Sequence, residues 1–297
     1  MSYKEFKEGI MQMAAWQAEM NKTCETHGKR YEIPLEGRNI EIVVYLKRPD
    51  APVVFCGFGG GFVFGGCALD DMLWNTIHDK LDVTLVSIGY RRAPEFKFPC
   101  GLNDMYDVIA YVEDNKEEFG IESDDYSVYG NSAGANLVTN VCMLDTKRGG
   151  KLKIKRQILN YPYCDLYTIP KEKGQTENQR YMYQIFIDDY CKPEELNNPL
   201  VSPVFAKEED LANMPRAIIS LAENDPLLPE GARYINKLRG AGVNVVSHIA
   251  AKMQHGYSET FFQGENEYLA EDEIKAIRDG SMEREVYRTI DFIKENW

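Results

Sequence analysis

The chain has 297 residues, 44% of them hydrophobic, which is an ordinary composition for a folded protein with a buried core. Its 47 acidic side chains outnumber 34 basic ones, so the formal net charge is −13. This balance repels nucleic acid and anionic membrane surfaces, so we expect a small neutral or cationic molecule as the partner.

The N-terminal residues carry no apolar core of the kind that a secretory signal requires. Residues 51–69 are uncharged, but six of these nineteen positions are glycine, so we expect no membrane span there. Seven scattered cysteines favour reduced thiols, and the sequence therefore predicts a cytoplasmic location. Four histidines without a His-Glu-x-x-His motif give no support for a metal site.

In chain order, the first predicted element is a helix with an apolar stripe within residues 1–28. Two runs around the turn at 35–38 then predict an antiparallel hairpin. Six later runs rich in β-branched residues predict buried strands, separated by segments of helical period such as 102–112 and 286–297. This alternation predicts a mostly parallel sheet with helices on both faces. The predicted strands are Arg30–Pro34, Asn39–Lys47, Val53–Cys56, Val83–Ile88, Tyr126–Tyr129, Ile158–Tyr161, Ala217–Leu221 and Val243–Ile249.

Two segments stand outside this alternation. Residues 1–28 precede the sheet, and residues 165–206 interrupt the strand and helix rhythm with a run of aromatic side chains, including Tyr183 and Phe186. Either segment could form a cap over the functional site. Packing against the body of the protein is the equal alternative.

A strand-to-helix turn carries the strongest chemical signal. Residues 130–134 read Gly-Asn-Ser-Ala-Gly and match Gly-x-Ser-x-Gly, the sharp turn that lifts a serine hydroxyl above a sheet. A predicted strand leads into this turn and a predicted helix, Ala133–Leu144, leaves it. Because a serine hydroxyl alone is a weak nucleophile, Ser132 needs a base and an acid that orients the base.

Among the four histidines, His255 is our candidate base because it lies in a loop after the last predicted strand and precedes a glycine. The other three lie in the N-terminal segment, a predicted helix and an apolar strand: His27, His78 and His248. Asp225 follows another strand, where catalytic groups of open α/β sheets collect, and Glu223 is the rival acid. The order serine, aspartate, histidine is that of the α/β-hydrolase fold.

Gly59, Gly60 and Gly61 follow a predicted strand and offer bare backbone amides. The N–H groups of Gly60 and Gly61, with that of Ala133, would form an oxyanion hole for a tetrahedral intermediate. The sequence does not support a dinucleotide-binding site, because phenylalanine occupies the last glycine position of Gly-x-Gly-x-x-Gly. The Gly-Lys-Ser/Thr ending of a phosphate-binding loop is also missing.

Five ordered motifs resemble those of the hormone-sensitive-lipase-like carboxylesterases across roughly residues 50–260. They are the glycine loop at 57–65, the segment Tyr-Arg-Arg-Ala-Pro-Glu at 90–95, the serine turn, Asp-Pro-Leu at 225–227 with Glu230, and His-Gly-Tyr at 255–257. The resemblance implies one α/β-hydrolase domain over 1–297, with an eight-stranded sheet and a helical cap from about 1–28 and 165–206. It also implies hydrolysis of short acyl esters without a cofactor.

Four positions depart from the family pattern. Phe58 replaces a histidine, Arg92 a leucine, Asn131 a frequent aspartate and Ala135 a common glycine. None of them removes a triad group or an oxyanion-hole amide. The acidic stretch 265–273 has the character of an insertion before the final helix. The basic run at 147–156 could grip an anion, but a solvated loop leading into a strand is the favoured interpretation.

The sequence therefore predicts a serine carboxylesterase with Ser132, Asp225 and His255 as its triad. An amidase or small-peptide hydrolase with the same triad, and a non-catalytic small-molecule receptor, remain alternatives. The candidate substrate-binding residues are Phe62, Phe64, Tyr183 and Phe186. A homodimer is compatible with the sequence.

Overall fold

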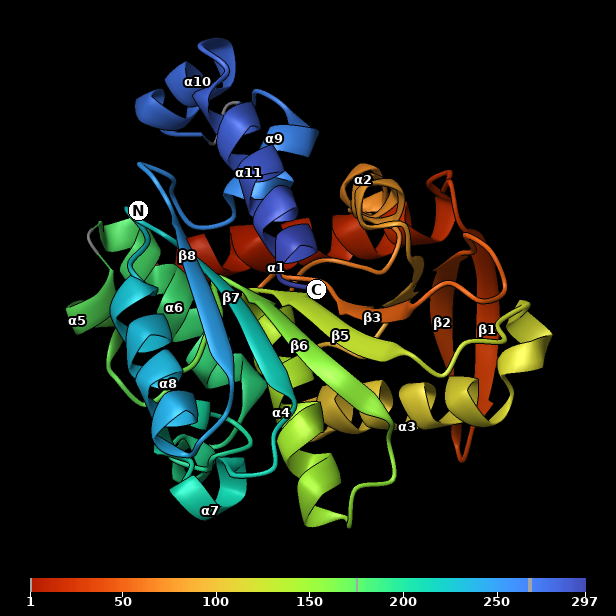
Figure 1. The fold of residues 1–297 in the computed structure, drawn as a ribbon. Coiled ribbons are helices and arrows are strands. Elements are labelled where there is room, and N and C mark those ends of the chain that lie inside the picture. Colours follow the sequence, from red (N-terminus) through yellow and green to blue (C-terminus); the bar gives the residue numbers. More distant parts are fainter. Residues whose placement is uncertain (1, 175, 267–268) are drawn as a thin grey trace.

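The computed structural model describes residues 2–174, 176–266 and 269–297. Its centre is an eight-stranded sheet in the order β1-β2-β4-β3-β5-β6-β7-β8 (Figure 1). The strands are β1 Lys29–Leu35, β2 Arg38–Tyr45, β3 Val53–Gly57, β4 Thr84–Ile88, β5 Tyr126–Asn131, β6 Ile154–Asn160, β7 Arg216–Ala222 and β8 Val245–Ala250.

The sheet is mostly parallel, as predicted. β1 and β2 form the expected antiparallel hairpin, in which Ile33 pairs with Ile40, and β2 also runs antiparallel to β4. All other neighbouring strands are parallel. Every residue of β3, β4 and β5 is buried, as expected for parallel strands covered on both faces. The carboxyl ends of the parallel strands therefore meet at one edge, where loops can assemble a site.

Two strands begin two or more residues away from their predicted first residue. β6 begins at Ile154, not Ile158, because Lys155 and Arg156 lie on its partly exposed initial half, which hydrophobicity alone does not reveal. The basic side chains at this start, Lys155 and Arg156, pair with Asp125, and Lys153 just before the strand pairs with Asp124. β8 begins at Val245, two residues later than predicted, because the chain turns at Gly242 with a positive φ of 83°.

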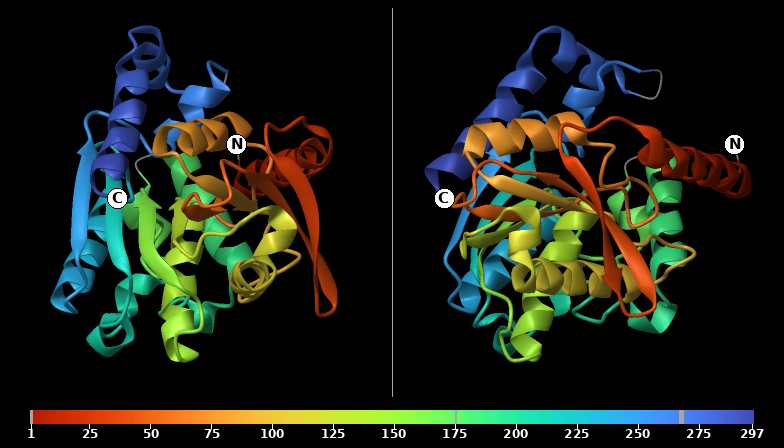
Figure 2. Two further views of the ribbon diagram at one scale, coloured as in Figure 1. Left: turned by 45° about the vertical axis from the view of Figure 1, so that its right-hand side comes forward. Right: turned by 90° about the vertical axis from the view of Figure 1, so that its right-hand side faces the viewer.

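Helices cover both faces of the sheet (Figure 2). The segments α3, α4 and α8 pack on one face, and α2 and α11 pack on the other. The helices are α1 Tyr3–Thr23, α2 Asp71–Leu81, α3 Cys100–Asp114, α4 Ala133–Lys147, α5 Pro170–Lys173, α6 Glu177–Tyr190, α7 Glu208–Leu211, α8 Leu228–Gly240, α9 Tyr257–Gln263, α10 Glu271–Arg278 and α11 Ser281–Glu295, with short 3₁₀ turns at Lys116–Phe119, Pro193–Glu195 and Pro203–Phe205.

The two segments outside the strand and helix alternation, residues 1–28 and 165–206, contact each other through α1 and α6. α1 begins with a capping box, in which the Ser2 hydroxyl accepts from Glu5 N and the Glu5 carboxylate accepts from Ser2 N. The helix contacts α6 through the rings of Tyr3 and Phe6, which both pack on Tyr181. N- and C-terminal halves of the sequence thus meet beside the carboxyl ends of the strands.

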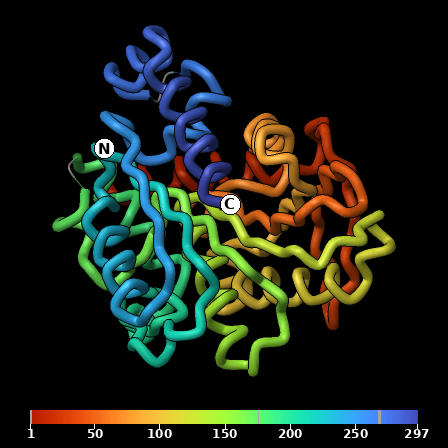
Figure 3. The backbone as a smooth tube through the Cα atoms, viewed as in Figure 1, coloured from red at the N-terminus to blue at the C-terminus, as the bar shows by residue number. Residues whose placement is uncertain are grey.

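After β8 the chain leaves the sheet through α9 and α10 and returns along α11, as the tube in Figure 3 shows. The predicted acidic stretch 265–273 forms the link between α9 and α10 and the first turn of α10, apart from residues 267 and 268, which lie outside the described residues. Within the described part of the chain, no helix combines the length and the apolar character that crossing a membrane requires.

Candidate active site

Ser132 occupies a strained turn between β5 and α4. Its φ of 53° and ψ of −115° lie outside the favourable regions for a residue with a side chain. The turn is crowded: a Cβ at Gly130 would lie 2.3 Å from the carbonyl carbon of Gly134, and one at Gly134 would lie 2.0 Å from the Gly57 oxygen. The two glycines of the motif are therefore required by close backbone packing.

The structure brings the three predicted triad side chains into one hydrogen-bonded chain. His255 Nε2 lies 2.8 Å from Ser132 Oγ, and His255 Nδ1 lies 2.7 Å from Asp225 Oδ2. Asp225 follows β7 and its side chain is only 1% exposed, while its Oδ1 accepts a hydrogen bond from Leu227 N. The loops after β5, β7 and β8 thus bring a serine, an aspartate and a histidine to the same point.

The rival residues lie elsewhere. Glu223 accepts a hydrogen bond from Lys252 N and makes no contact with His255. His27 pairs with Asp71, and the remaining two histidines contact Val83 O and Glu285: His78 and His248. Geometry therefore selects His255 and Asp225 among the residues that the sequence left open.

The surroundings of His255 set its basicity. Burial lowers the pKa of the imidazole, but the charge and the hydrogen bond of Asp225 outweigh this effect, so the pKa is raised above 6.5. Glu259 and Glu230 act in the same direction through their charges. A raised pKa makes the neutral ring a stronger base toward the serine proton.

The glycine loop after β3 presents free amides beside Ser132. Gly60 and Gly61 have φ values of 111° and 59°. Within the described residues, the N–H groups of Gly60, Gly61 and Ala133 donate no hydrogen bond. Ala133 N is also the first amide of α4, where the helix leaves donors unsatisfied and the dipole favours negative charge.

Contacts of Phe58 and Arg92 hold the glycine loop in place. The Phe58 ring stacks on Tyr90 at 4.1 Å, and Tyr90 OH donates to the Phe58 carbonyl at 2.9 Å. Arg92 Nη1 donates to the Gly65 carbonyl at 2.7 Å. Phe58 does not line the cavity that holds Ser132, so its ring supports the loop and does not face a bound molecule.

A cavity of about 570 Å³ opens at Ser132 and His255. Of the four predicted substrate-binding residues, Phe64, Tyr183 and Phe186 line it. The prediction for Phe62 is wrong as to position: this ring is 1% exposed and stacks on Tyr190 at 3.7 Å, away from the cavity. Its φ of 69° turns the side chain into the core, which residue type alone does not predict.

Among the cavity residues that sequence reasoning missed are Asp70, Tyr163 and Glu259. Glu259 lies in the first turn of α9, which begins two residues after His255, and this closeness in sequence could have served as a signal. Asp70 and Tyr163 belong to distant segments, and only folding brings them to the site.

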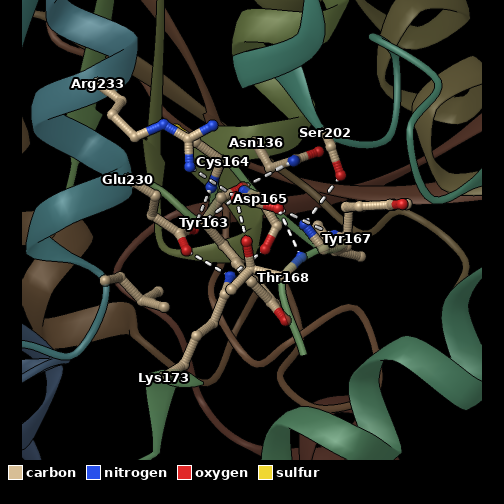
Figure 4. Close-up of polar contacts among 12 residues, drawn as sticks. Asn136, Tyr163, Cys164, Asp165, Tyr167, Thr168, Lys173, Ser202, Glu230 and Arg233 are labelled. Carbon is tan, nitrogen blue, oxygen red and sulfur yellow. Dashed lines mark hydrogen bonds and ion pairs between the residues drawn. The ribbon is translucent and has the colours of Figure 1, made fainter. Parts of the chain in front are cut away.

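A buried polar network fixes residues 163–173 behind the cavity (Figure 4). The Lys173 ammonium contacts the Glu230 carboxylate and the Asp165 carbonyl, and both charged side chains are 5% exposed. Glu230 Oε1 also accepts from Cys164 N and Asp165 N at 2.7 and 3.0 Å. Through Glu230, α8 holds the segment that leads into α5 and α6.

Comparison with known proteins places this geometry in a family. Residues 54–259 match the family model described as alpha/beta hydrolase fold. The chain is 31% identical over 258 residues to an arylesterase of Saccharolobus solfataricus. The matched region covers 82% of this chain and 81% of the relative. It is also 31% identical over 232 residues to a carboxylesterase of Mycobacterium tuberculosis, covering 74% of this chain and 71% of that protein.

Solved structures of esterases agree with this family assignment. A hyperthermophilic esterase from the archaeon Pyrobaculum calidifontis superposes with a TM-score of 0.75 at 27% identity, covering 98% of this chain and 92% of the other. A thermostable carboxylesterase cloned from a metagenomic library gives a TM-score of 0.75 at 28% identity and covers 98% of both chains.

Proposed function

The chain belongs to the ester-hydrolysing enzymes of the α/β-hydrolase family, and from this premise we propose that it is a serine carboxylesterase acting on short-chain acyl esters. The observation that carries the proposal is the hydrogen-bonded chain from Asp225 through His255 to Ser132. A serine with an oriented base is the arrangement that acyl transfer requires.

The proposed reaction runs through an acyl-enzyme. Ser132 Oγ attacks the ester carbonyl carbon while His255 Nε2 takes the serine proton, and the N–H groups of Gly60, Gly61 and Ala133 stabilise the resulting oxyanion. The tetrahedral intermediate collapses, and the alcohol leaves with the proton from His255. Water then attacks the acyl carbon with His255 again as base, which releases the carboxylic acid and restores Ser132.

We also propose that α1 with α5 and α6 forms the helical cap of one domain over 1–297. Both α1 and α6 contribute to the cavity lining, through Met13 and Gln17 and through Tyr183 and Phe186. The ring of Phe186 lies so close to Gly61 that a Cβ there would meet it at 2.2 Å. This crowding supports a preference for short acyl groups. The cytoplasmic location and the homodimer stay predictions.

An organophosphonate probe tests the nucleophile, since it phosphonylates an activated serine and not an ordinary one. We expect a single label on Ser132, and loss of the label and of nearly all ester hydrolysis in Ser132→Ala. Ser123→Ala, which removes a serine at the opposite end of the sheet, is the matched control and should behave as wild type. Labelling of Ser132→Ala at the wild-type rate would exclude Ser132 as the nucleophile.

A panel of nitrophenyl esters and anilides of graded acyl length separates the esterase from the alternatives. We expect turnover to fall with acyl length and to be slower for anilides, and a chelator to have no effect. Faster turnover of anilides would favour the amidase. Binding without turnover would favour the receptor.

A further inference from the structure

Acidic side chains line part of the Ser132 cavity: Asp70 immediately before α2, Glu259 in α9 and Glu273 in α10. Asp70 and Glu259 are neighbours, and we call this pair the acidic wall. No lysine or arginine lines this cavity in the described part of the chain, and none of the three carboxyl groups pairs with one there. The protein therefore places neighbouring carboxyl groups in the cavity without a lysine or arginine that would stabilise their negative charge.

This charge lies beside the reacting groups. A Cβ at Gly59 would lie 3.2 Å from Glu259 Oε1 and 3.7 Å from Ser132 Cβ, so the carboxylate flanks the serine. The hydroxyl of Tyr161 donates to Glu259, and the Tyr161 ring packs edge-on against His255 at 5.1 Å. A positive group bound near Glu259 would therefore sit within reach of an ester held at Ser132.

Asp70 and Glu259 are partly buried in the cavity lining and interact with each other. Burial, and then the charge of Glu259, raise the pKa of Asp70 to about 8. Burial also raises the pKa of Glu259 against the hydrogen bond from Tyr161. Two neighbouring, partly buried carboxyl groups without a lysine or arginine beside them disfavour the ionised form, and a cation carried by a ligand would reduce this penalty.

The cavity also has an aromatic lining, which we call the aromatic wall. The rings of Phe64, Tyr163, Tyr183 and Phe186 line the cavity, and aromatic faces attract alkylammonium groups. Tyr163 is 1% exposed, and its hydroxyl has no hydrogen-bond partner in the described structure. The described residues contain no group of three or more side chains placed to hold a metal ion.

We propose that this cavity selects esters that carry an alkylammonium group, with Asp70 and Glu259 supplying the opposing charge and the aromatic wall contacting the alkyl groups. The inference rests on the proposed esterase function and names the substrate class of that site. The net charge of −13 adds long-range attraction for such substrates.

Two pairs of isosteric esters test the proposal by kcat/KM. Acetylcholine and 3,3-dimethylbutyl acetate have the same shape and differ in charge on the alcohol side, and glycine betaine ethyl ester and ethyl 3,3-dimethylbutanoate differ in charge on the acyl side. Because the ammonium group also activates the ester carbonyl, each kcat/KM is divided by the rate constant for hydroxide-catalysed hydrolysis of the same ester before the members of a pair are compared. We expect a preference of about tenfold or more for the charged member in at least one pair, and that pair identifies the side that faces the acidic wall.

The variant Asp70→Asn/Glu259→Gln should reduce this charged-to-neutral ratio by roughly tenfold. Glu118→Gln removes one charge at the opposite end of the sheet and should leave the ratio unchanged. The measured quantity is a ratio of kcat/KM values between matched esters, so a general loss of activity in a variant does not alter it.

A wild-type ratio of one or less in both pairs, or an unchanged ratio in the double variant, would overturn the proposal. If the double variant does not fold, inhibition of neutral ester hydrolysis by tetramethylammonium chloride replaces it. Stronger inhibition than by sodium chloride at equal concentration supports the proposal, and equal inhibition overturns it. Absence of any ester hydrolysis and of probe labelling would instead contradict the esterase function.

Discussion

At the scale of single residues, the site depends on a few atoms held in otherwise unfavourable positions. Ser132 keeps a positive φ because the strand before it and the helix after it fix both ends of the turn. His255 is partly exposed to the cavity and lies against Asp225, which holds one ring nitrogen and directs the other toward the serine. Reactivity at this position therefore follows from local geometry that the surrounding elements impose.

The raised pKa of His255 predicts the pH dependence of hydrolysis. The imidazole must be neutral to accept the serine proton, so kcat/KM should rise with pH on one ionisation above 6.5. A pH–rate profile on two neutral esters with different leaving groups checks this, because both should give the same inflection for the free enzyme. An inflection below about 6 would mean that Asp225 does not stabilise the imidazolium.

The glycine loop allows a comparison of two substitutions. Gly61→Val should reduce kcat by roughly 10²-fold or more, because Gly61 has a positive φ and a Cβ would strike the Phe186 ring. Phe58→His should keep kcat within about tenfold, since the Phe58 ring stacks on Tyr90 and not on the cavity. Thermal melts confirm folding, and kcat is measured on one activated ester.

Equal damage from Phe58→His and Gly61→Val would mean that the ring at position 58 takes part in catalysis. Recovery of kcat in Gly61→Val/Phe186→Ala would mean that displacement of Phe186, and not of the backbone N–H, causes the loss.

At the scale of elements, the segment that carries the cavity's aromatic wall is tied to the body by one buried ion pair. Lys173 ends α5 and meets Glu230 of α8, while its ammonium lies 4.8 Å from the centre of the Tyr163 ring. The pKa of Glu230 is raised by burial to about 7 even with Lys173 nearby. Loss of the lysine would leave this carboxylate buried without a counter-charge.

Lys173→Met should lower the free energy of unfolding by about 3–5 kcal/mol near pH 8, because breaking a buried pair leaves one unpaired charge. The effect should shrink at pH 5, where Glu230 can be protonated. Chemical denaturation measures both, and Lys171→Met, an exposed lysine of the same helix, should change stability little. A loss of less than about 0.5 kcal/mol at pH 8 would show that the pair does not hold this segment.

At the scale of the whole molecule, the buried carboxylates and the large net negative charge both make the fold less stable as the pH rises. Burial raises the pKa of Asp70 to about 8 and those of Glu113 and Glu230 to about 7. A carboxyl group with a raised pKa in the folded state stabilises the fold below its ordinary pKa near 4, and this contribution is lost as pH rises through the folded value. Repulsion among the net 13 negative charges adds to the loss.

The melting temperature should therefore fall between pH 6 and pH 9. Asp70→Asn should flatten this decline, because the asparagine does not ionise. Thermal melts of wild type, Asp70→Asn and the exposed control Asp50→Asn across this range provide the measurement. A wild-type melting temperature that stays constant or rises from pH 6 to pH 9 would contradict the predicted effect of these buried groups.

The sequence predicted those parts of the site that have a local signature. Ser132, Asp225 and His255 each follow a strand, and such positions reach the same edge of a parallel sheet whatever the details of packing. The sheet and its hairpin were predicted for the same reason, since buried strands and turn residues act over short distances. The start of β6 was missed because its charged side chains, Lys155 and Arg156, are stabilised by Asp125 from the segment before β5.

The sequence by itself predicted the strands of the sheet, the turn that carries Ser132, and the positions of Asp225 and His255 after strands, because each of these has a signature in a few consecutive residues. Only the tertiary structure decided that Phe62 turns into the core, that Lys173 meets Glu230, and that Asp70 and Glu259 share one cavity wall. These contacts join residues from distant segments, and their energies depend on which groups folding removes from water together. No local pattern records that information.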